Sequence, residues 1–196
     1  MEIRTFPRRN NYFNAGISAL CDAGFHFRKS KEELIIVCMA PWSVRDVVSA
    51  SWMKSWVESK ILIVSDSRFF PLAKYLQLQN RDIIEVCHTL EFYGVLRDLL
   101  WQGKLYSIKQ EVGTPHLTDM EYVSLQYALD GISAEKQAMS MGLSSKTVFT
   151  HRAASARKLS VKKLSHLLSP KILNSSSSLR KEYCQYLDWP HKSPDS

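Results

Sequence analysis

Cationic side chains are concentrated in one short stretch of the chain, SSKTVFTHRAASARKLS, at residues 144–160. Among small residues it holds five basic or potentially basic ones: Lys146, His151, Arg152, Arg157 and Lys158. Residues 133–171 carry eight lysines and arginines and one acid, a net charge of +7 that equals the formal charge of the whole 196-residue chain. The rest of the chain therefore sums to zero. A positive charge confined to one segment is typical of a surface that binds a polyanion.

Capping and stop signals predict four helices around these cations. A T-x-x-E capping box begins the first helix at Thr118, serines can cap the second and third, and glycines can close the first and second. The expected helices span residues 118–130, 133–141, 144–159 and 161–168. The turn over residues 141–144 is typical of a helix-turn-helix, in which one helix braces the next in the major groove of DNA.

Residues 117–159 resemble the four-helix DNA-binding domain of LuxR/FixJ-type bacterial transcription regulators. The matching positions are L-T-x-x-E at 117–121, Gly131, Ala138, G-L-S-x-K-T-V at 142–148, His151 and K-L at 158–159. The resemblance implies that the helix after Ser144 lies in the major groove of double-stranded DNA. It also implies that Val148 and Leu159 belong to the core.

Nine residues are candidates for DNA contact. The resemblance implies that Lys146 and Thr147 touch phosphate, and that Phe149, Thr150 and Ala153 lie nearest the bases. An exposed Phe149 would contact a thymine methyl group. For His151, a structural or phosphate-donating role and a base-reading role stay open. Three further cations on the same helix are expected to bind phosphate, although they could merely solvate it: Arg152, Arg157 and Lys158.

Two departures from the family pattern affect this helix-turn-helix. Many members have an aliphatic residue where Gln137 stands, which calls into question how tightly the second helix packs. Many also have Asn-Ile where Ala154-Ser155 stand, and the small residues here resemble those of the Rcs-type and enterobacterial fimbrial regulators.

The first hundred residues predict a different architecture. Apolar runs at 33–39, 60–65 and 82–87 predict strands buried on both faces, with weaker strands near Ile3 and at 25–29. Helical patterns occupy residues 12–23, 43–59, 71–78 and 90–100. Strands that alternate with helices predict an α/β domain with a parallel sheet and flanking helices.

This front half resembles, in degenerate form, the receiver domain of two-component response regulators. Receiver phosphorylation requires clustered carboxylates that hold magnesium and an acceptor aspartate after the third strand. Here that position is Cys38-Met39-Ala40-Pro41, and Thr5-Phe6-Pro7 stand where the first strand should supply acids. Asp66 lacks companion carboxylates, so we expect a loop role for it. The sequence therefore predicts regulation without aspartyl phosphorylation, and no metal or cofactor.

Aromatic and leucine side chains near the end of the front domain favour a dimer interface, since such side chains serve interfaces and the corresponding receiver surface forms dimers. A second, smaller contact is expected in the fourth C-terminal helix. The candidate interface residues are Phe92, Tyr93, Leu96, Leu100, Trp101, Leu164 and Leu168. Two recognition helices in a dimer could read repeated half-sites one turn of DNA apart.

The expected organisation is a receiver-like domain at 1–103, a linker at 104–116, a LuxR-type helix-turn-helix domain at 117–170 and a partly disordered tail at 171–196. Four widely spaced cysteines predict buried free thiols, and the longest apolar run is too short to cross a membrane. A cytoplasmic location follows from these patterns. The residues show no catalytic constellation, so no enzyme activity is expected.

Three regulatory hypotheses remain. The first is a sequence-specific dimeric regulator that binds promoter DNA and contacts RNA polymerase or another regulator. The second is an auxiliary protein that works as a heterodimer through its front domain. The third is a ligand-sensing regulator, for example of a cyclic dinucleotide, although the arginine-tryptophan motif of known nucleotide-sensing relatives is not visible.

Overall fold

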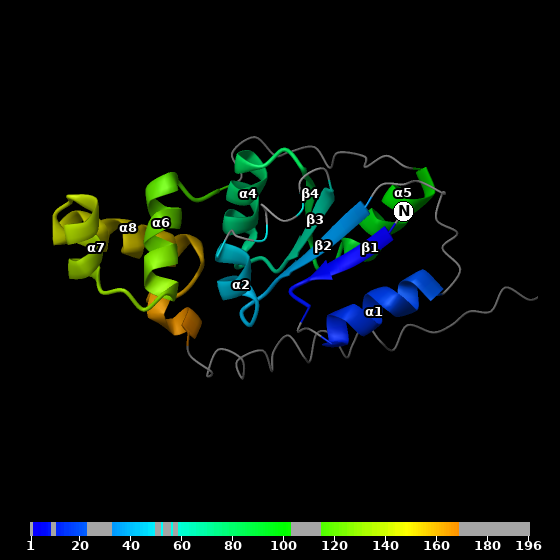
Figure 1. Cartoon of the computed structure of the whole chain (residues 1–196), viewed down its shortest axis with the longest axis horizontal. Helices are drawn as coiled ribbons and strands as arrows, with labels where there is room; N and C mark the ends of the chain where they lie inside the picture. Colours follow the sequence, from blue (N-terminus) through cyan, green and yellow to red (C-terminus); the bar gives the residue numbers. More distant parts are fainter. Residues whose placement is uncertain are drawn as a thin grey trace, which may run out of the picture.

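The computed structural model describes residues 2–8, 11–22, 33–49, 52, 56, 59–102 and 115–168. The described residues up to 102 form an α/β unit around a parallel sheet, and residues 119–168 form a helical unit beside it (Figure 1). The predicted fold class, an α/β front half followed by an all-helical C-terminal half, is confirmed. Most of the predicted linker and the whole predicted tail lie outside the described residues, so the four domain boundaries stay predictions.

Four parallel strands make up the described sheet, in the order β1-β2-β3-β4. They span Glu2–Phe6 (β1), Glu33–Met39 (β2), Lys60–Ser65 (β3) and Ile83–His88 (β4). The predicted bounds of β2 and β3 are confirmed, and β4 lies one residue further along than predicted. The expected strand at 25–29 lies outside the described residues.

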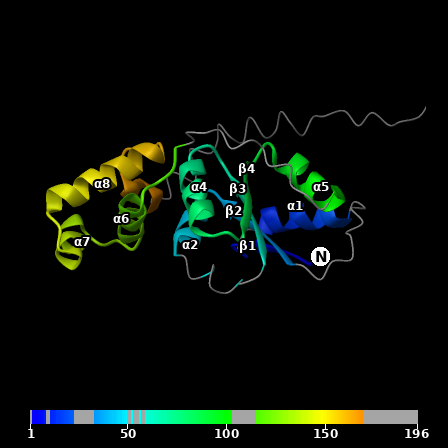
Figure 2. The same ribbon diagram turned by 90° about the horizontal axis from the view of Figure 1, so that it is seen from above.

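Helices cover both faces of the sheet (Figure 2). On one face lie α2 (Val44–Val48) and α4 (Phe70–Gln79), and on the other α1 (Asn11–Asp22) and α5 (Phe92–Gln102). Side chains of β2 alternate between the two apolar clusters, because successive residues of a strand point to opposite faces. Ile35 and Val37 join the cluster that contains α2 and α4, whereas Leu34 and Ile36 join the cluster that contains α1 and α5. Both clusters are apolar.

Within the helix expected over residues 43–59, the structure describes α2 at Val44–Val48 and a helical residue at Trp52. Ser49 caps α2, and the Trp52 indole N–H donates to the Val47 carbonyl at 2.6 Å. Of the remaining positions in that prediction, 50, 51, 53–55, 57 and 58 lie outside the described residues.

The C-terminal half contains three α-helices and one 3₁₀ helix in its described part. They are α6 (Asp119–Leu129), α7 (Ala134–Met141), α8 (Ser145–Lys158) and η1 (Leu164–Leu168). The capping box between Thr118 and Glu121 is confirmed, and Gly131 follows α6 with a positive φ of 75°. The fourth helix is a 3₁₀ turn of five residues. Its prediction as a helix from residue 161 was too long, because residues 161–163 are not helical.

Helix α6 joins the two halves, because it packs against α2 and α4 of the front domain (Figure 1). Leu117, Tyr122 and Leu125 belong to the same apolar cluster as the sheet residues under α2 and α4. The Tyr122 ring lies 4.6 Å from the ring of Tyr75 on α4, centroid to centroid. The core of the front domain therefore continues into the helical domain.

Polar bonds reinforce this contact between the domains. The Tyr122 hydroxyl and the Gln126 amide both donate to the Val48 carbonyl, at 3.0 and 3.2 Å. Asp119 accepts hydrogen bonds from the side chains of Tyr75 and Gln79, at 3.0 and 3.2 Å. Burial raises the pKa of Tyr122 to about 12, so its hydroxyl stays a hydrogen-bond donor at neutral pH.

Candidate nucleic-acid interface

Two caps and one left-handed glycine shape the turn between α7 and α8. The Ser133 side chain accepts a hydrogen bond from the Lys136 backbone N–H at 3.2 Å and so caps α7. Gly142 ends α7 with a φ of 64°, a conformation that costs glycine less than any other residue. Ser144 caps α8 by accepting from the Thr147 N–H at 3.1 Å. These signals of a helix-turn-helix are confirmed.

One face of α8 is anchored in the protein. Val148 is fully buried in a small cluster with Ala134 and Ala138 of α7. Ala156 and Leu159 are buried in the larger cluster that also holds α6. The predicted core positions of Val148 and Leu159 are confirmed, and their burial fixes which side chains of α8 face outward.

The opposite face of α8 is exposed. Its side chains are those of Lys146, Phe149, Thr150, Ala153 and Arg157, which recur at helical spacing. Phe149 is 54% exposed, which confirms the expected exposure of this aromatic ring. Helix α7 and the start of α8 lie on the side of α6 away from the sheet (Figures 1 and 2), so the front domain leaves this end of the molecule open.

Local hydrogen bonds orient the side chains at the start of α8. The hydroxyl groups of Thr147 and Ser144 lie 2.8 Å apart, and Thr147 is half-buried. The Thr150 hydroxyl donates to the Lys146 carbonyl at 3.0 Å, which leaves its oxygen able to accept a further bond. His151 is half-buried at the edge of the exposed face. Thr147, His151 and all five outward residues are predicted to contact DNA, and that role stays a prediction.

Arg152 points back into the helical domain. Its Nε donates to Gln137 Oε1 at 2.9 Å, and its Nη2 donates to the Ile132 carbonyl at 2.7 Å. Burial lowers the pKa of Arg152, and the nearby Glu135 carboxylate counteracts part of that effect. The sequence suggested a phosphate contact for this side chain, but the structure gives it two partners in the protein.

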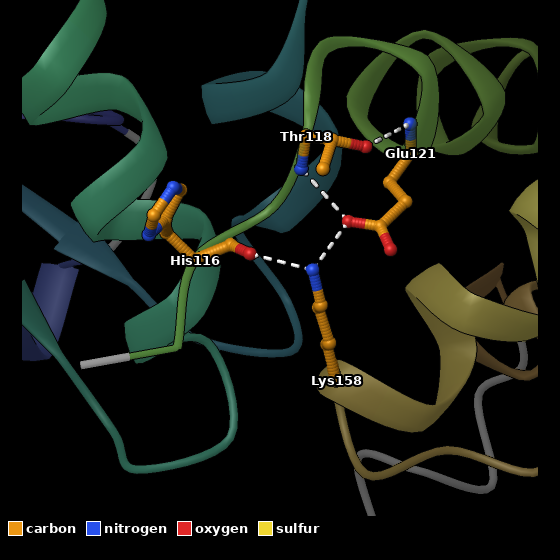
Figure 3. Close-up of polar contacts among 4 residues, drawn as sticks. All are labelled: His116, Thr118, Glu121 and Lys158. Atoms are coloured by element: carbon orange, nitrogen blue, oxygen red, sulfur yellow. Dashed lines mark hydrogen bonds and ion pairs between the residues drawn. The ribbon is translucent and has the colours of Figure 1, made fainter. Parts of the chain in front are cut away.

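Lys158, the last residue of α8, is likewise held by the protein (Figure 3). Its ammonium group donates to the His116 carbonyl and to Glu121 Oε2, both at 2.7 Å. Glu121 Oε2 also accepts the Thr118 backbone N–H at 2.7 Å within the capping box. The end of α8 is therefore bound to the start of α6. A phosphate contact by Lys158 would compete with these bonds, and it stays a prediction.

The same contacts set the charge state of Glu121. Burial by itself would raise the pKa of Glu121, but hydrogen bonds from Lys158 and from the Thr118 backbone, together with the charge of Lys158, outweigh it. The net effect is a pKa below the ordinary value of 4.5. The carboxylate is therefore ionised at neutral pH and pairs with the ammonium group.

The structure corrects part of the expected dimer interface. Leu96 is 1% exposed and packs under α5 against the sheet, and Leu164 is 4% exposed in the cluster beneath α6. Neither has surface left for a partner, because both fill the protein's own core. Phe92 is half-buried, 6.2 Å from the ring of Phe13.

Other members of that predicted surface are exposed. Tyr93 at the start of α5 and Leu168 at the end of η1 both have exposed side chains. The side chains of Leu100 and Trp101 lie outside the described ones. A dimer contact through these residues stays a prediction.

Asp66 follows β3, where the structure gives it a local role. Its carboxylate accepts the backbone N–H groups of Arg68 and Phe69, at 3.0 and 3.2 Å, at the entrance to α4. Burial raises the pKa of Asp66, and these N–H groups oppose that rise. At the end of β2, where a receiver carries its acceptor, the structure places Met39 and Ala40, both buried.

Neither a metal-binding cluster nor a membrane-spanning helix occurs among the described residues. Within residues 2–8, 11–22, 33–49, 52, 56, 59–102 and 115–168, no group of three or more His, Cys, Asp or Glu side chains could hold a metal ion. Over the same ranges, no helix has the length and apolar character to span a bilayer. Two of the four cysteines, Cys38 and Cys87, are buried and form no disulfide.

In the sequence, Gln137 stands out only as a departure from the LuxR-type family pattern, and the structure shows where its side chain lies. It is fully buried, and its amide donates to the Ser124 hydroxyl at 3.1 Å while its carbonyl oxygen accepts from Arg152. Helix α7 is therefore well packed, against the concern raised by the sequence. A buried glutamine paired with an arginine fifteen residues away gives no periodic signal, so sequence reasoning had no means of joining them.

Two protein-family models match the chain. Residues 1–97 match the EcpR N-terminal domain, and residues 115–169 match the bacterial regulatory proteins of the luxR family. The first match corresponds to the α/β unit of the structure, and the second corresponds to the helical unit. A comparison with curated proteins found no match.

Solved structures of the response regulator RcsB show a distant likeness to the chain. A structure of two RcsB dimers bound to two parallel DNAs shares 14% identity over 85% of this chain and 96% of that one, with a TM-score of 0.37. A structure of an RcsB–DNA complex also shares 14% identity over 85% and 96%, with a TM-score of 0.34. A structure of RcsB from Salmonella typhimurium shares 16% sequence identity over 79% of this chain and 80% of that one, with a TM-score of 0.30.

Proposed function

Because the chain is a LuxR-type DNA-binding regulator with an EcpR-type, receiver-like front domain, we propose that it binds promoter DNA sequence-specifically, as a dimer and without aspartyl phosphorylation. The observation that carries this proposal is the exposed face of α8, where Lys146, Phe149, Thr150, Ala153 and Arg157 lie together on a helix whose other face is anchored. A helix presented in this way fits the major groove.

The outward residues divide by chemistry into two groups. Lys146 and Arg157, near the two ends of α8, would bind phosphates and hold the helix in register on the duplex. Phe149 and Thr150 lie between them, where an exposed ring can meet a thymine methyl and a hydroxyl can bond to a base edge. Ala153 beside them has a side chain small enough to allow close approach.

Independence from phosphorylation is supported by two features of the front domain. Met39 and Ala40 occupy the acceptor position, and the Asp66 carboxylate is engaged by backbone N–H groups. In addition, α6 is docked on the front domain while the outer face of α8 stays exposed. Binding to DNA would then require no release of the helical domain.

Promoter contact by a regulator of this kind takes place in the cytoplasm, with RNA polymerase or a second regulator as the protein partner. Homodimerisation is the form that we propose, with Tyr93 and Leu168 as exposed candidate contacts. In the auxiliary alternative, the front domain would pair with a different LuxR-type protein. Sedimentation of the purified chain with and without a duplex separates the two, because a monomer that binds DNA only weakly on its own favours the auxiliary role.

The test begins with duplexes that the wild-type protein selects from a random-sequence pool. Lys146→Ala should weaken binding to selected and scrambled duplexes by a similar factor, because a phosphate contact carries no sequence information. Thr150→Ala should instead change the preference among selected sites. Fluorescence anisotropy at several salt concentrations measures both effects, and Arg97→Ala, on the exposed surface of α5, is the control for charge loss elsewhere.

Failure of the wild-type protein to bind any duplex in dilute buffer would remove the proposal. An equal loss on every site from Thr150→Ala would remove only the base-reading role of Thr150.

A further inference from the structure

The interior of the helix-turn-helix contains a chain of polar side chains that links three helices. Ser124 of α6 and Gln137 of α7 are both fully buried, and the amide of Gln137 donates to the Ser124 hydroxyl at 3.1 Å. Arg152 of α8 completes the chain through its bond to Gln137 Oε1. Buried polar groups of this kind are stable only when they are paired, so each member fixes the position of the next.

Arg152 is the member that reaches the recognition helix. Its guanidinium bonds at one nitrogen to Gln137 on α7 and at another to the Ile132 carbonyl, in the turn between α6 and α7. A planar guanidinium with two bound nitrogens has little rotational freedom. The side chain therefore restrains α8 in rotation and translation against both preceding elements.

Apolar contacts hold both the first turns and the end of α8, and those of the first turns involve small side chains. The cluster that anchors its first turns consists of Ala134, Ala138 and Val148, with Leu143 packed against it. Further along α8, Ser155 is fully buried, and its hydroxyl has no hydrogen-bond partner within the described residues. Small and polar side chains supply little of the packing that would otherwise hold a helix in place. The bonds of Arg152 thus add a directional restraint to the apolar packing of Ala156 and Leu159.

We propose that Arg152 is a positioning residue: it sets the orientation of α8 for base reading through Gln137 and the Ile132 carbonyl, and it does not bind phosphate. This inference rests on the proposed function. Thr150 and Ala153 lie within two positions of Arg152 on the same helix, so a rotation of α8 would move them relative to base edges. Phosphate contacts made by long flexible side chains tolerate such a shift better than short base contacts do.

Salt dependence distinguishes the two roles of an arginine. The salt slope, meaning the magnitude of the slope of log K against log salt, falls by about 0.9 on duplex DNA for each phosphate contact that is lost. A positioning residue leaves that slope unchanged and instead reduces the preference for the selected duplex over a scrambled one. Arg157 provides a matched control, because it is an exposed arginine on the same helix.

The experiment measures affinity for one selected and one scrambled duplex over a range of salt. Arg152→Lys and Arg152→Gln should each lower the preference for the selected duplex about tenfold, since a single good base contact is worth about 1–3 kcal/mol. Their salt slopes should equal that of the wild type. Arg157→Gln should weaken both duplexes alike and lower the slope by about 0.9.

Variants at Gln137 test the same chain from its other side. Gln137→Glu keeps an acceptor for Arg152 Nε and should retain the preference, whereas Gln137→Leu removes the acceptor and should lose it. Retained binding to the scrambled duplex shows that each variant is folded. If a substitution of Arg152 unfolds the domain, the Gln137 pair decides the question.

Three results would overturn the inference. In the first, Arg152→Gln lowers the salt slope by about 0.9 and weakens the affinity for both duplexes equally, while Arg152→Lys behaves as the wild type. The second is an unchanged preference in folded Arg152→Lys and Arg152→Gln. The third is an unchanged preference in Gln137→Leu. If the wild type binds no duplex at all, the proposed function fails first, and that result is distinct from these three.

Discussion

Strand β2 of the front domain and the helix-turn-helix bury different kinds of side chain. Along β2, residues 34 to 39 are all buried, and all are apolar or cysteine. The helical domain instead buries Ser124, Gln137 and Ser155 among its leucines and alanines. The side chains of β2 are held by area removed from water, which has no direction. The core of the helical domain depends in part on hydrogen bonds, which fix angles and distances.

This difference suits what each domain has to do. Dense apolar packing, added to the hydrogen bonds between strands, stabilises a sheet that is covered by helices on both faces. A recognition helix must keep its orientation within a fraction of the width of a base pair, and directional bonds give it that restraint. Stability measurements on matched variants can test whether the two cores respond as differently as they look.

The largest effect is expected in the sheet. Leu62→Ala, in the centre of β3, should lower the free energy of unfolding by about 2–5 kcal/mol, because it removes a fully buried side chain and leaves a cavity. Leu78→Ala on α4 makes the same chemical change at a side chain that is 64% exposed, and it should alter stability by less than about 0.5 kcal/mol. Urea unfolding followed by circular dichroism measures both. Similar losses in the two variants would contradict the packing argument.

A smaller loss is expected from an apolar substitution in the helical core. Gln137→Leu should destabilise the protein by about 1–3 kcal/mol although leucine is more hydrophobic, since it leaves Arg152 Nε and the buried Ser124 hydroxyl without the partners that Gln137 supplies. Adding Arg152→Leu should restore part of the loss, because the unpaired Nε is then removed. The same urea titration gives both values. A more stable Gln137→Leu single variant would show that the polar chain is dispensable for folding.

The smallest effect concerns the pair of Glu121 and Lys158 at the edge of the helical core. A carboxyl whose pKa is lowered on folding contributes stability above its ordinary pKa of 4.5, and that contribution is lost as the pH falls through its folded value. Glu121→Gln should therefore be less stable than the wild type by about 1 kcal/mol at pH 7, and the difference should shrink below pH 4.5. Thermal unfolding from pH 7 to pH 3 measures it. A gap that widens on acidification would contradict the role of the pair.

Several features were readable from local sequence because local chemistry produces them. The apolar runs at 33–39 and 60–65 gave the bounds of β2 and β3, since strands buried on both faces tolerate few polar side chains. Ser133, Gly142 and Ser144 gave the turn of the helix-turn-helix, because caps act within three or four residues. The outward position of Phe149 followed from helix geometry once Val148 was placed inward.

Residues that act through distant partners were misread or left unresolved. Leu96 and Leu164 looked suited to a dimer interface, yet both are buried in the monomer, because a leucine on a helix gives no sign of which surface it meets. Arg152 and Lys158 looked like free cations, and each is bound by the protein. The docking of α6 on α2 and α4 through Tyr122 left no pattern in the sequence either.

By itself the sequence determined the two architectures, the helix-turn-helix with its caps, the concentration of positive charge and the absence of an acceptor aspartate after β2. All of these depend on residue type and on spacing within one turn or one strand. Only the tertiary structure decided which cations of α8 face solvent and which are held inside, and that α6 fuses the two cores. Those outcomes depend on groups far apart in the chain, such as Lys158 with His116 and Arg152 with Ile132. Their bonds exist only once folding has brought them together.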